Sequence, residues 1–273
     1  MAAGFTDLAM ACHLAEQAVR AARSLGNDRL LIRAIAELCT TCCLAGEPEA
    51  GLPFGQESVE RARQFGDDVL LAVSLVNYLP TLGPTRSLPL ADEAIVCTER
   101  SGDQLTNFYL HNNACWDALS IGAVPAARAH LEAAARAGQA IGLQDVVAEL
   151  NLGVVLLEEG DLDGARSSLE AALRISRRNG DNRSIAEAVL LLTCLAGDSG
   201  DWSRAALLHG AAQAVQDRTG VPWDELDARY RRDGLDQART RLGDEQLQEA
   251  CARGMRLSFD QAFDLAFGTP RPE

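Results

Sequence analysis

Two interleaved series of glycines recur along this chain at a nearly constant interval, and this periodicity limits what the chain can fold into. In the first series an Asp follows each glycine within three residues, and the second series falls about half a period later. Successive members of either series are 36 to 40 residues apart. Glycine commonly ends a helix and Asp or Asn begins the next one, so the pattern predicts two helices per repeat. The first series is Gly26, Gly66, Gly102, Gly142 and Gly180; the second is Gly46, Gly83, Gly122, Gly160 and Gly200.

The segments between these glycines carry apolar residues with helical rather than strand periodicity. The clearest unit spans 148–180, where Leu152-Gly153 and Gly160 are followed by Ala165 and Leu169. This unit resembles the tetratricopeptide repeat, although Leu156 stands where tyrosine is usual and the terminal proline is missing. A period of about 38 residues is similar to that of the MalT-like subclass found in bacterial regulators.

An apolar face that one helix pair cannot bury alone is buried when pairs stack. We therefore expect an all-α fold, a right-handed α-solenoid of about five tetratricopeptide-like helix pairs within 1–220, preceded by a half-repeat at 5–26. In the second pair, Pro80, Pro84 and Pro89 should shorten the first helix and lengthen the turn. The repeats share two small-residue positions: Gly153 aligns with Cys39, Val76, Cys115 and Thr193, and Ala165 aligns with Gly51, Leu88, Ala127 and Ala205.

The stretch from Arg204 is similar to the end of the repeat region in large actinobacterial regulators, namely LuxR-type and SARP-type transcription factors and related predicted signalling ATPases. The resemblance implies a C-terminal helical capping region at 221–268, followed by a tail at 269–273. It also implies a sensory or scaffolding part of a regulator that lacks its own ATPase and DNA-binding domains. Phe259, Phe263 and Phe267 form one stripe that should cover the apolar face of the final repeat. The residues that carry the resemblance are Ala205-Ala206, Leu208 to Ala212, Gly220, Pro222, Tyr230, Ala238-Arg239, Leu242-Gly243, Gly254 and Ala262, with Cys251 where the family often has Trp.

Charge and composition exclude several classes of function. The 273 residues contain 25 Lys and Arg against 39 Asp and Glu, a net charge of −14, which disfavours direct nucleic-acid binding. The chain has no lysine, which excludes phosphate-binding loops, protein-kinase chemistry and Schiff-base catalysis. No long apolar run or secretory signal is evident, so we expect no membrane contact and a cytoplasmic location.

Cysteines and histidines could hold a metal or catalyse a reaction, but their spacing favours packing. Cys39, Cys42 and Cys43 supply a single C-x-x-C pair within a helix, whereas zinc sites usually need two such pairs. Buried free thiols also indicate a reducing compartment. His13, His111, His130 and His209 match no catalytic motif and are interpreted as packed or surface residues. We therefore expect no metal, no cofactor and no enzymatic activity.

A binding groove remains as the candidate site. In this repeat class the first helix of each pair lines the concave surface, where peptides or small ligands bind. The third pair stands out because two aromatic residues and two amides share adjacent turns, a combination suited to sugar, peptide or small-molecule recognition. The alternative is that Tyr109 and Trp116 are buried between helices. The predicted groove residues are Arg33, Glu37, Thr40, Ser74, Asn77, Tyr109, Asn112, Asn113, Trp116, Asn151 and Glu187.

From the sequence we expect a non-enzymatic protein- or ligand-binding scaffold, an interaction module related to bacterial transcriptional or signalling regulators. Its partner would be a protein or peptide, or a small effector. The alternative is a structural protein that self-associates through the N-terminal half-repeat, giving a homo-oligomer without a small-molecule ligand.

Overall fold

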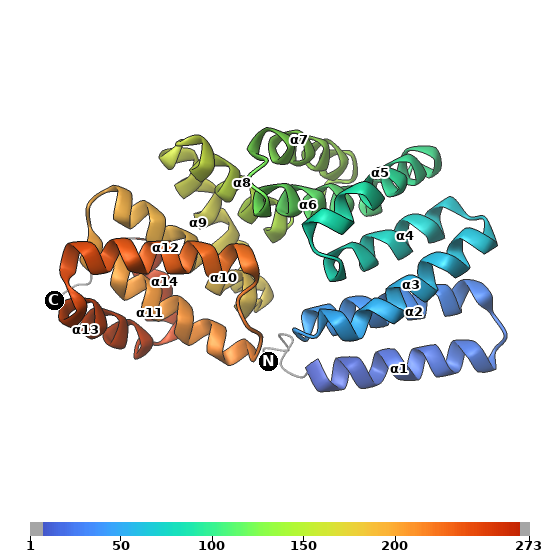
Figure 1. Ribbon diagram of the computed structural model, residues 1–273, viewed down its shortest axis with the longest axis horizontal. Helices are drawn as coiled ribbons and strands as arrows, with labels where there is room; N and C mark the ends of the chain where they lie inside the picture. The colour runs from blue at the N-terminus through green and yellow to red at the C-terminus, as the bar shows by residue number, and fades with distance from the viewer. Residues whose placement is uncertain (1–7, 268–273) are drawn as a thin grey trace. The chain divides into compact units, whose positions relative to one another are not determined.

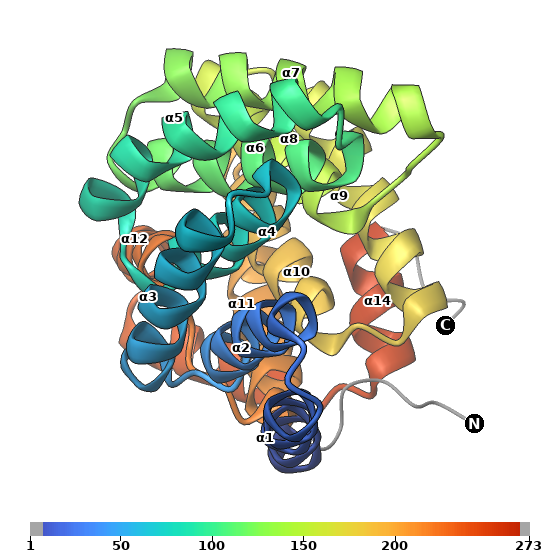
Figure 2. The ribbon, with the colours of Figure 1, turned by 90° about the vertical axis from the view of Figure 1, so that its right-hand side faces the viewer.

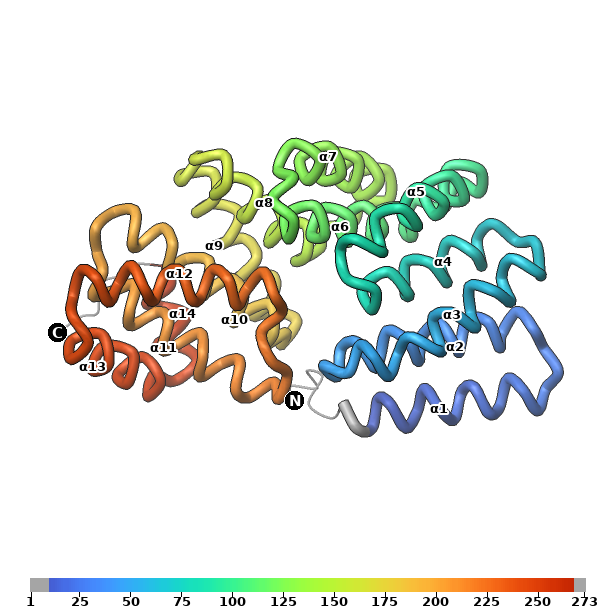
Figure 3. Tube along the Cα trace, in the orientation of Figure 1, coloured from blue at the N-terminus to red at the C-terminus, as the bar shows by residue number. Residues whose placement is uncertain are grey.

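In this computed structural model, which describes residues 8–267, the chain is all α-helical apart from one 3-10 turn, and no strand occurs in that range. The chain can be followed from helix to helix in Figures 1 and 3. The all-α class, with consecutive helices packed as repeats, is confirmed. The predicted tail at 269–273 lies outside the described residues. The helices are α1 (Leu8–Ser24), α2 (Asp28–Leu44), α3 (Pro48–Phe65), α4 (Asp68–Tyr78), η1 (Leu79–Thr81), α5 (Pro84–Ser101), α6 (Gln104–Ser120), α7 (Val124–Ile141), α8 (Val146–Glu159), α9 (Leu162–Asn179), α10 (Asn182–Asp198), α11 (Trp202–Thr219), α12 (Glu225–Leu242), α13 (Asp244–Met255) and α14 (Phe259–Phe267).

The repeating glycines end or separate helices, as the sequence predicted. All ten members of the two series have φ between 60° and 81°, a conformation that glycine adopts without steric cost. In the first series the Asp or Asn that follows accepts a hydrogen bond from a backbone N–H of the next helix. These capping residues are Asn27, Asp67, Asp103, Asp145 and Asp181.

The chain divides into two compact units, one of residues 5–144 and one whose described part is 145–267. In the first unit α1 packs on α2, and α2–α3, α4–α5 and α6–α7 form consecutive pairs. The first helices of successive pairs also touch, α2 with α4 and α4 with α6, as expected when pairs stack as repeats.

The second pair departs from the others in the predicted way. Its first helix, α4, has 11 residues where α2 and α6 have 17, and the short turn η1 follows it. Pro84 occupies the first turn of α5, where a missing N–H costs nothing, whereas Pro89 lies inside that helix. At the two shared positions Val76 and Leu88 are only half-buried, so this pair is less tightly packed than its neighbours.

In the second unit α8–α9 and α10–α11 continue the pairing, and α8 contacts α10. Gly153 lies against Leu169 so closely that a Cβ there would be 2.6 Å from the leucine Cδ2. Helices α12 and α13 then pack on α11. The predicted boundary after residue 220 falls inside this unit, because the capping helices and the last pair share one core that includes Ala206, Ala238 and Leu247.

Helix α14 packs on α9, α10 and α11 and is visible beside them in Figure 2. Its buried residues are Ala262 and Ala266, whereas the three phenylalanines are half-buried. The Cζ atoms of Arg174 and Arg177 lie 4.8 Å and 4.5 Å from the ring centroids of Phe267 and Phe263. The expectation that the phenylalanine stripe covers an apolar face is therefore wrong in detail: the small residues of α14 are buried, and two of its rings lie beneath arginines of α9.

Within residues 8–267 no helix is both long enough and apolar enough to cross a lipid bilayer.

Candidate functional site

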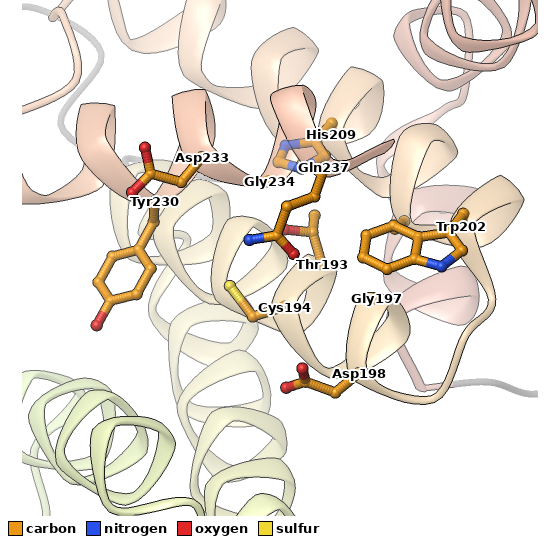
Figure 4. A pocket seen from close by; sticks show the side chains of 11 residues that line it. Thr193, Cys194, Gly197, Asp198, Trp202, His209, Tyr230, Asp233, Gly234 and Gln237 are labelled. Atoms are coloured by element: carbon orange, nitrogen blue, oxygen red, sulfur yellow. The ribbon is translucent and has the colours of Figure 1, made fainter. Parts of the chain in front are cut away.

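The candidate site is a pocket of about 200 Å³ in the C-terminal unit, formed by α10, α11 and α12 and shown in Figure 4. Residues from all three helices turn toward a common space, with Gln237, Cys194 and Trp202 around it and Asp198 below them. The lining residues are Thr193, Cys194, Gly197 and Asp198 from α10; Trp202, Ala205 and His209 from α11; and Tyr230, Asp233, Gly234 and Gln237 from α12.

His209 is the residue that distinguishes this pocket from ordinary packing. Its side chain is 2% exposed, and neither ring nitrogen has a hydrogen-bond partner among residues 8–267. Burial, with a smaller contribution from Arg231, lowers the pKa of His209 to about 4. The imidazole is therefore neutral at physiological pH, and one nitrogen can donate a hydrogen bond while the other accepts one. A buried polar group without a partner is costly, and a ligand that pairs with it removes that cost.

The space of the pocket depends on two glycines in its lining. A Cβ at Gly234 would lie 2.6 Å from His209 Nε2, and a Cβ at Gly197 would lie 2.9 Å from Cζ3 of Trp202. Any larger residue on α12 or α10 at these positions would push the imidazole or the indole aside. The size of the pocket thus depends on the absence of two side chains.

The remaining polar groups of the pocket are mostly hydrogen-bond acceptors. The hydroxyl of Thr193 donates to Leu190 O at 2.5 Å, which leaves its oxygen lone pairs available. The hydroxyl of Tyr230 donates to the carboxylate of Glu158, and burial raises the pKa of Tyr230. Asp198, Asp233 and Gln237 are exposed on the rim.

The charge states of the pocket favour binding over nucleophilic catalysis. A catalytic cysteine needs a lowered pKa, usually from a neighbouring imidazolium, to supply its thiolate. Burial instead raises the pKa of Cys194 to about 11, while that of His209 falls to about 4. The thiol and the imidazole are both neutral, so the pocket presents hydrogen-bonding groups without an activated nucleophile.

A largely buried charge cluster lies where the start of α12 packs against the N-terminal part of α10. Arg183 Nε donates to Glu187 Oε1 at 2.9 Å, and Arg183 Nη2 is 3.9 Å from Asp224 Oδ2. Asp227 is 1% exposed, and its Oδ1 has no hydrogen-bond partner in the described residues. Burial raises the pKa of Asp227 well above its usual range, and the carboxylates of Glu187 and Asp224 raise it further. One arginine therefore faces three carboxyl groups.

The predicted groove residues of the N-terminal unit are unequally placed. Arg33, Glu37 and Tyr109 are exposed, Tyr109 by 38%, so they are available to a partner. Thr40, Asn77, Asn113 and Trp116 are half-buried, whereas Ser74 is fully buried.

Two of these polar side chains in the N-terminal unit bind backbone. Asn113 Nδ2 donates to Val76 O at 3.3 Å and so links α6 to α4. Asn112 is 1% exposed, and its Nδ2 donates to Phe108 O within its own helix at 2.9 Å. The expectation that Asn112 lines an open groove is wrong, because neighbouring helices cover that side of α6.

The two predicted groove residues of the C-terminal unit are also occupied inside the fold. Asn151 is 1% exposed, so its placement in an open groove is wrong for the same reason. The side chain of Glu187 is 14% exposed and is paired with Arg183 in the charge cluster. Neither residue lines the pocket around His209.

Cysteines 39 and 42 pack as small apolar residues, as predicted from the repeat register. Cys39 is fully buried, and its thiol donates to Asn77 O at 3.4 Å. Burial raises the pKa of Cys39 to about 12 and also raises that of Cys42. In residues 8–267 no group of three or more His, Cys, Asp or Glu side chains could hold a metal ion.

A second depression, of about 340 Å³, lies in the N-terminal unit beside Tyr78 and Arg86. Three of its polar lining residues already have partners: Gln56 donates to Glu60 at 2.9 Å, and Arg63 pairs with Glu93 at 2.6 Å. It contains no buried polar group that lacks a partner, so the pocket around His209 is the stronger candidate.

The sequence interpretation missed this pocket. The sequence analysis interpreted His209 as a packed or surface residue, and the structure confirms that it is buried. Its lack of hydrogen-bond partners depends on how α12 packs, and α12 begins more than a dozen residues later in the chain. A signal was available: His209 stands among small and apolar residues in Leu208 to Ala212, within the segment that carries the family resemblance. A polar residue in an apolar helix face needs a partner, and none was evident nearby.

The comparison with known proteins bears on the fold. No protein-family model matches the sequence, and no curated protein matches it. The crystal structure of BtubC (BKLC) from P. vanneervenii matches with a TM-score of 0.58, covering 81% of this chain and 95% of that chain at 17% identity. The likeness is one of fold. Helical-repeat folds serve many unrelated functions, so the function must be argued from the site.

Proposed function

We propose that this chain is a non-enzymatic binding module whose C-terminal unit takes a small effector in the pocket around His209. The observation that carries the proposal is the fully buried imidazole without a hydrogen-bond partner at the wall of a pocket. Folding leaves the desolvation cost of both ring nitrogens uncompensated, about 1–3 kcal/mol for such a group, and a ligand can recover it. A site retained at that cost is better explained by binding than by stability.

The resemblance to bacterial regulators supports the same proposal and gives it a context. The residues Leu208 to Ala212, Gly220 and Tyr230 belong to the segment that is similar to LuxR-type and SARP-type regulators, and His209 and Tyr230 line the pocket. We propose a sensory or interaction role in transcriptional or signalling regulation, in the cytoplasm, with a protein partner that reads the occupied state. The exposed groove candidates Arg33, Glu37 and Tyr109 are the proposed contacts with that partner.

The test is a thermal-shift screen of the purified chain against small amines, amino acids, carboxylates, sugars and nucleosides. Bound ligand raises the melting temperature, and the shift increases with the affinity and concentration of the ligand. We expect at least one class to raise it in the wild type and to have no effect on His209→Leu, which fills the site with an apolar side chain. Gly138→Ala is the control, because that glycine lies in the other unit. Shifts that persist in His209→Leu, or no shift in any class, contradict the proposal.

Self-association is the second candidate function, and exposed apolar residues of α1 and the following turn favour it. Met10, Leu14 and Leu25 are 51%, 55% and 70% exposed. Such residues can form an interface with a second copy. A molar mass that rises with protein concentration, and that stays at the monomer value in Leu14→Glu, supports this candidate; a mass independent of concentration contradicts it.

A further inference from the structure

The charged side chains that line the pocket are all acidic. Its lining includes the carboxylates of Asp198 and Asp233 and no arginine, and the chain has no lysine. The carboxylate Oδ1 of Asp233 lies 3.6 Å from Nε of the exposed Arg232, and this arginine neutralises part of the Asp233 charge. Asp198 has no ion pair and no side-chain hydrogen bond within residues 8–267. The lining itself therefore carries negative charge, and the nearby arginines lie outside it: Arg231 acts on His209, Arg232 on Asp233 and Arg241 on the Trp202 ring.

The position of Asp198 adds to this imbalance. It is the last residue of α10, where the helix dipole already places a partial negative charge. An acidic side chain is unfavourable at that end of a helix, and a cation there is favourable. Both effects attract a positively charged group to the rim formed by Asp198 and Gly197, the lower side of the pocket in Figure 4.

The deeper groups accept hydrogen bonds without repelling a cation. Since burial holds the pKa of His209 at about 4, its ring is uncharged and offers a free nitrogen lone pair. The Thr193 oxygen is also available as an acceptor, because its hydrogen is donated to Leu190 O. A carboxylate ligand would need an imidazolium or an arginine at this depth, and the lining supplies neither. An N–H donor suits these groups better.

The aromatic wall is compatible with the same ligand. The indole of Trp202 is half-buried over Gly197, and the guanidinium carbon of Arg241 lies 5.8 Å from its ring centroid. Cations are attracted to indole faces, and Arg241 already lies over this one, so the indole offers the ligand an apolar wall rather than a second site for its ammonium group. The pocket volume of about 200 Å³ is below the roughly 300 Å³ at which sites for drug-sized ligands begin, so the ligand is small.

We infer that the pocket binds a small aliphatic primary amine in its ammonium form, with the charged end at Asp198 and a second N–H or O–H donor directed at His209. This inference rests on the proposed function, because it names the chemical class of the effector for the same site. The charge comes from the unpaired carboxylate at the end of α10, and the directional contact comes from the unpartnered imidazole of α11.

Calorimetric titration with matched probes tests the ligand class. The probes are 1,4-diaminobutane, 4-amino-1-butanol, the neutral 1,4-butanediol and the dianion succinate, which share a four-carbon chain and differ in charge. We expect the two amines to bind, with affinity falling as salt rises, and the diol and succinate to bind at least about tenfold more weakly. Equal or tighter binding of succinate or the diol overturns the inference.

Two variants separate this inference from the proposed function. Asp198→Asn removes the charge at an exposed position, and we expect amine affinity to fall about fivefold or more, while the melting temperature of the free protein stays the same or rises slightly because an acidic residue is removed from a helix C-terminus. His209→Leu should reduce affinity about tenfold or more. Asp163→Asn, on the exposed first turn of α9, is the control and should bind normally.

The outcomes distinguish a failure of the inferred ligand class from a failure of the proposed function. If a neutral or anionic probe binds and loses affinity in His209→Leu but not in Asp198→Asn, the cationic class is wrong while the pocket remains a binding site. If no probe loses affinity in His209→Leu, the inference is wrong. If the broader thermal-shift screen also finds no ligand whose effect is lost in His209→Leu, the proposed function is wrong as well.

Discussion

Gly210 of α11 and Gly254 of α13 face each other where these helices cross, and each occupies space that no side chain can share. A Cβ at Gly210 would lie 2.0 Å from the carbonyl oxygen of Cys251, and a Cβ at Gly254 would lie 2.0 Å from that of Leu207. The Cβ at Gly254 would also lie 3.0 Å from the Cα of Gly210. The two backbones are therefore in direct contact. This contact joins the last repeat helix to the capping helices.

Gly210→Ala should destabilise the C-terminal unit by about 2 kcal/mol or more, because backbone atoms cannot move aside as a flexible side chain can. Urea unfolding measures the loss. Gly138→Ala is the matched control: its nearest neighbours are ring carbons of Phe108 at 3.1 Å, which can shift, and alanine favours the helix. Equal unfolding midpoints for wild type and Gly210→Ala would contradict the close crossing.

Gly153→Leu should cost about 1–3 kcal/mol by overpacking the α8–α9 contact against Leu169. Gly153→Ala should cost less than Gly153→Leu, because its Cβ, 2.8 Å from the Cγ of the buried Leu169, forces a smaller shift of that leucine and alanine has the higher helix propensity. Denaturant unfolding of both variants provides the comparison. A leucine variant as stable as the wild type would mean that the repeat register is misassigned.

Replacing Asp227 with Asn should change how stability depends on pH. Because the pKa of Asp227 is raised in the folded chain, the folded state holds this proton more tightly than the unfolded state. Its contribution to stability is present below the unfolded pKa, about 4, and is lost as pH rises through the folded pKa. The groups that face it are Glu187, Asp224 and Arg183.

We therefore expect the unfolding free energy of wild type, relative to Asp227→Asn, to fall as the pH rises above the unfolded pKa of about 4. Urea titrations of both proteins at each pH give the difference. Asp163→Asn, an exposed carboxyl group on α9, controls for the loss of one charge. A difference that rises with pH would show that Asp227 is stabilised as the anion.

The arginines of α9 should hold α14 in place. Arg177 pairs with Asp260 at 2.7 Å and lies over the ring of Phe263. Arg177→Met keeps the apolar stem and removes the charge, so we expect hydrogen exchange in 259–267 to accelerate about fivefold, equivalent to about 1 kcal/mol. Arg178→Met, at the exposed neighbouring position, should leave the exchange unchanged. Equal exchange in the two variants would show that α14 is held by Ala262 and Ala266 alone.

The groove residues show where sequence reasoning stops. Helical spacing placed Tyr109 and Asn112 on one side of α6, and the structure leaves the first exposed and the second buried. Spacing along one helix gives the direction of a side chain, but whether another helix covers that direction depends on packing. The same reason accounts for Asn151, and for the phenylalanines of α14, whose amphipathic pattern did not show that arginines would lie over them.

What the sequence determined by itself is the succession of helices: where each one ends at a glycine, where the next begins at an Asp or Asn, and that the second pair is shortened by proline. These features are local, because a left-handed glycine or a capping carboxylate acts within a few residues. The tertiary structure alone decided that His209 lacks a partner and that Asp198, Trp202 and Gly234 surround one space. The physical reason is that a pocket is a property of three helices packed together, and the cost of burying a polar group appears only when its surroundings are complete.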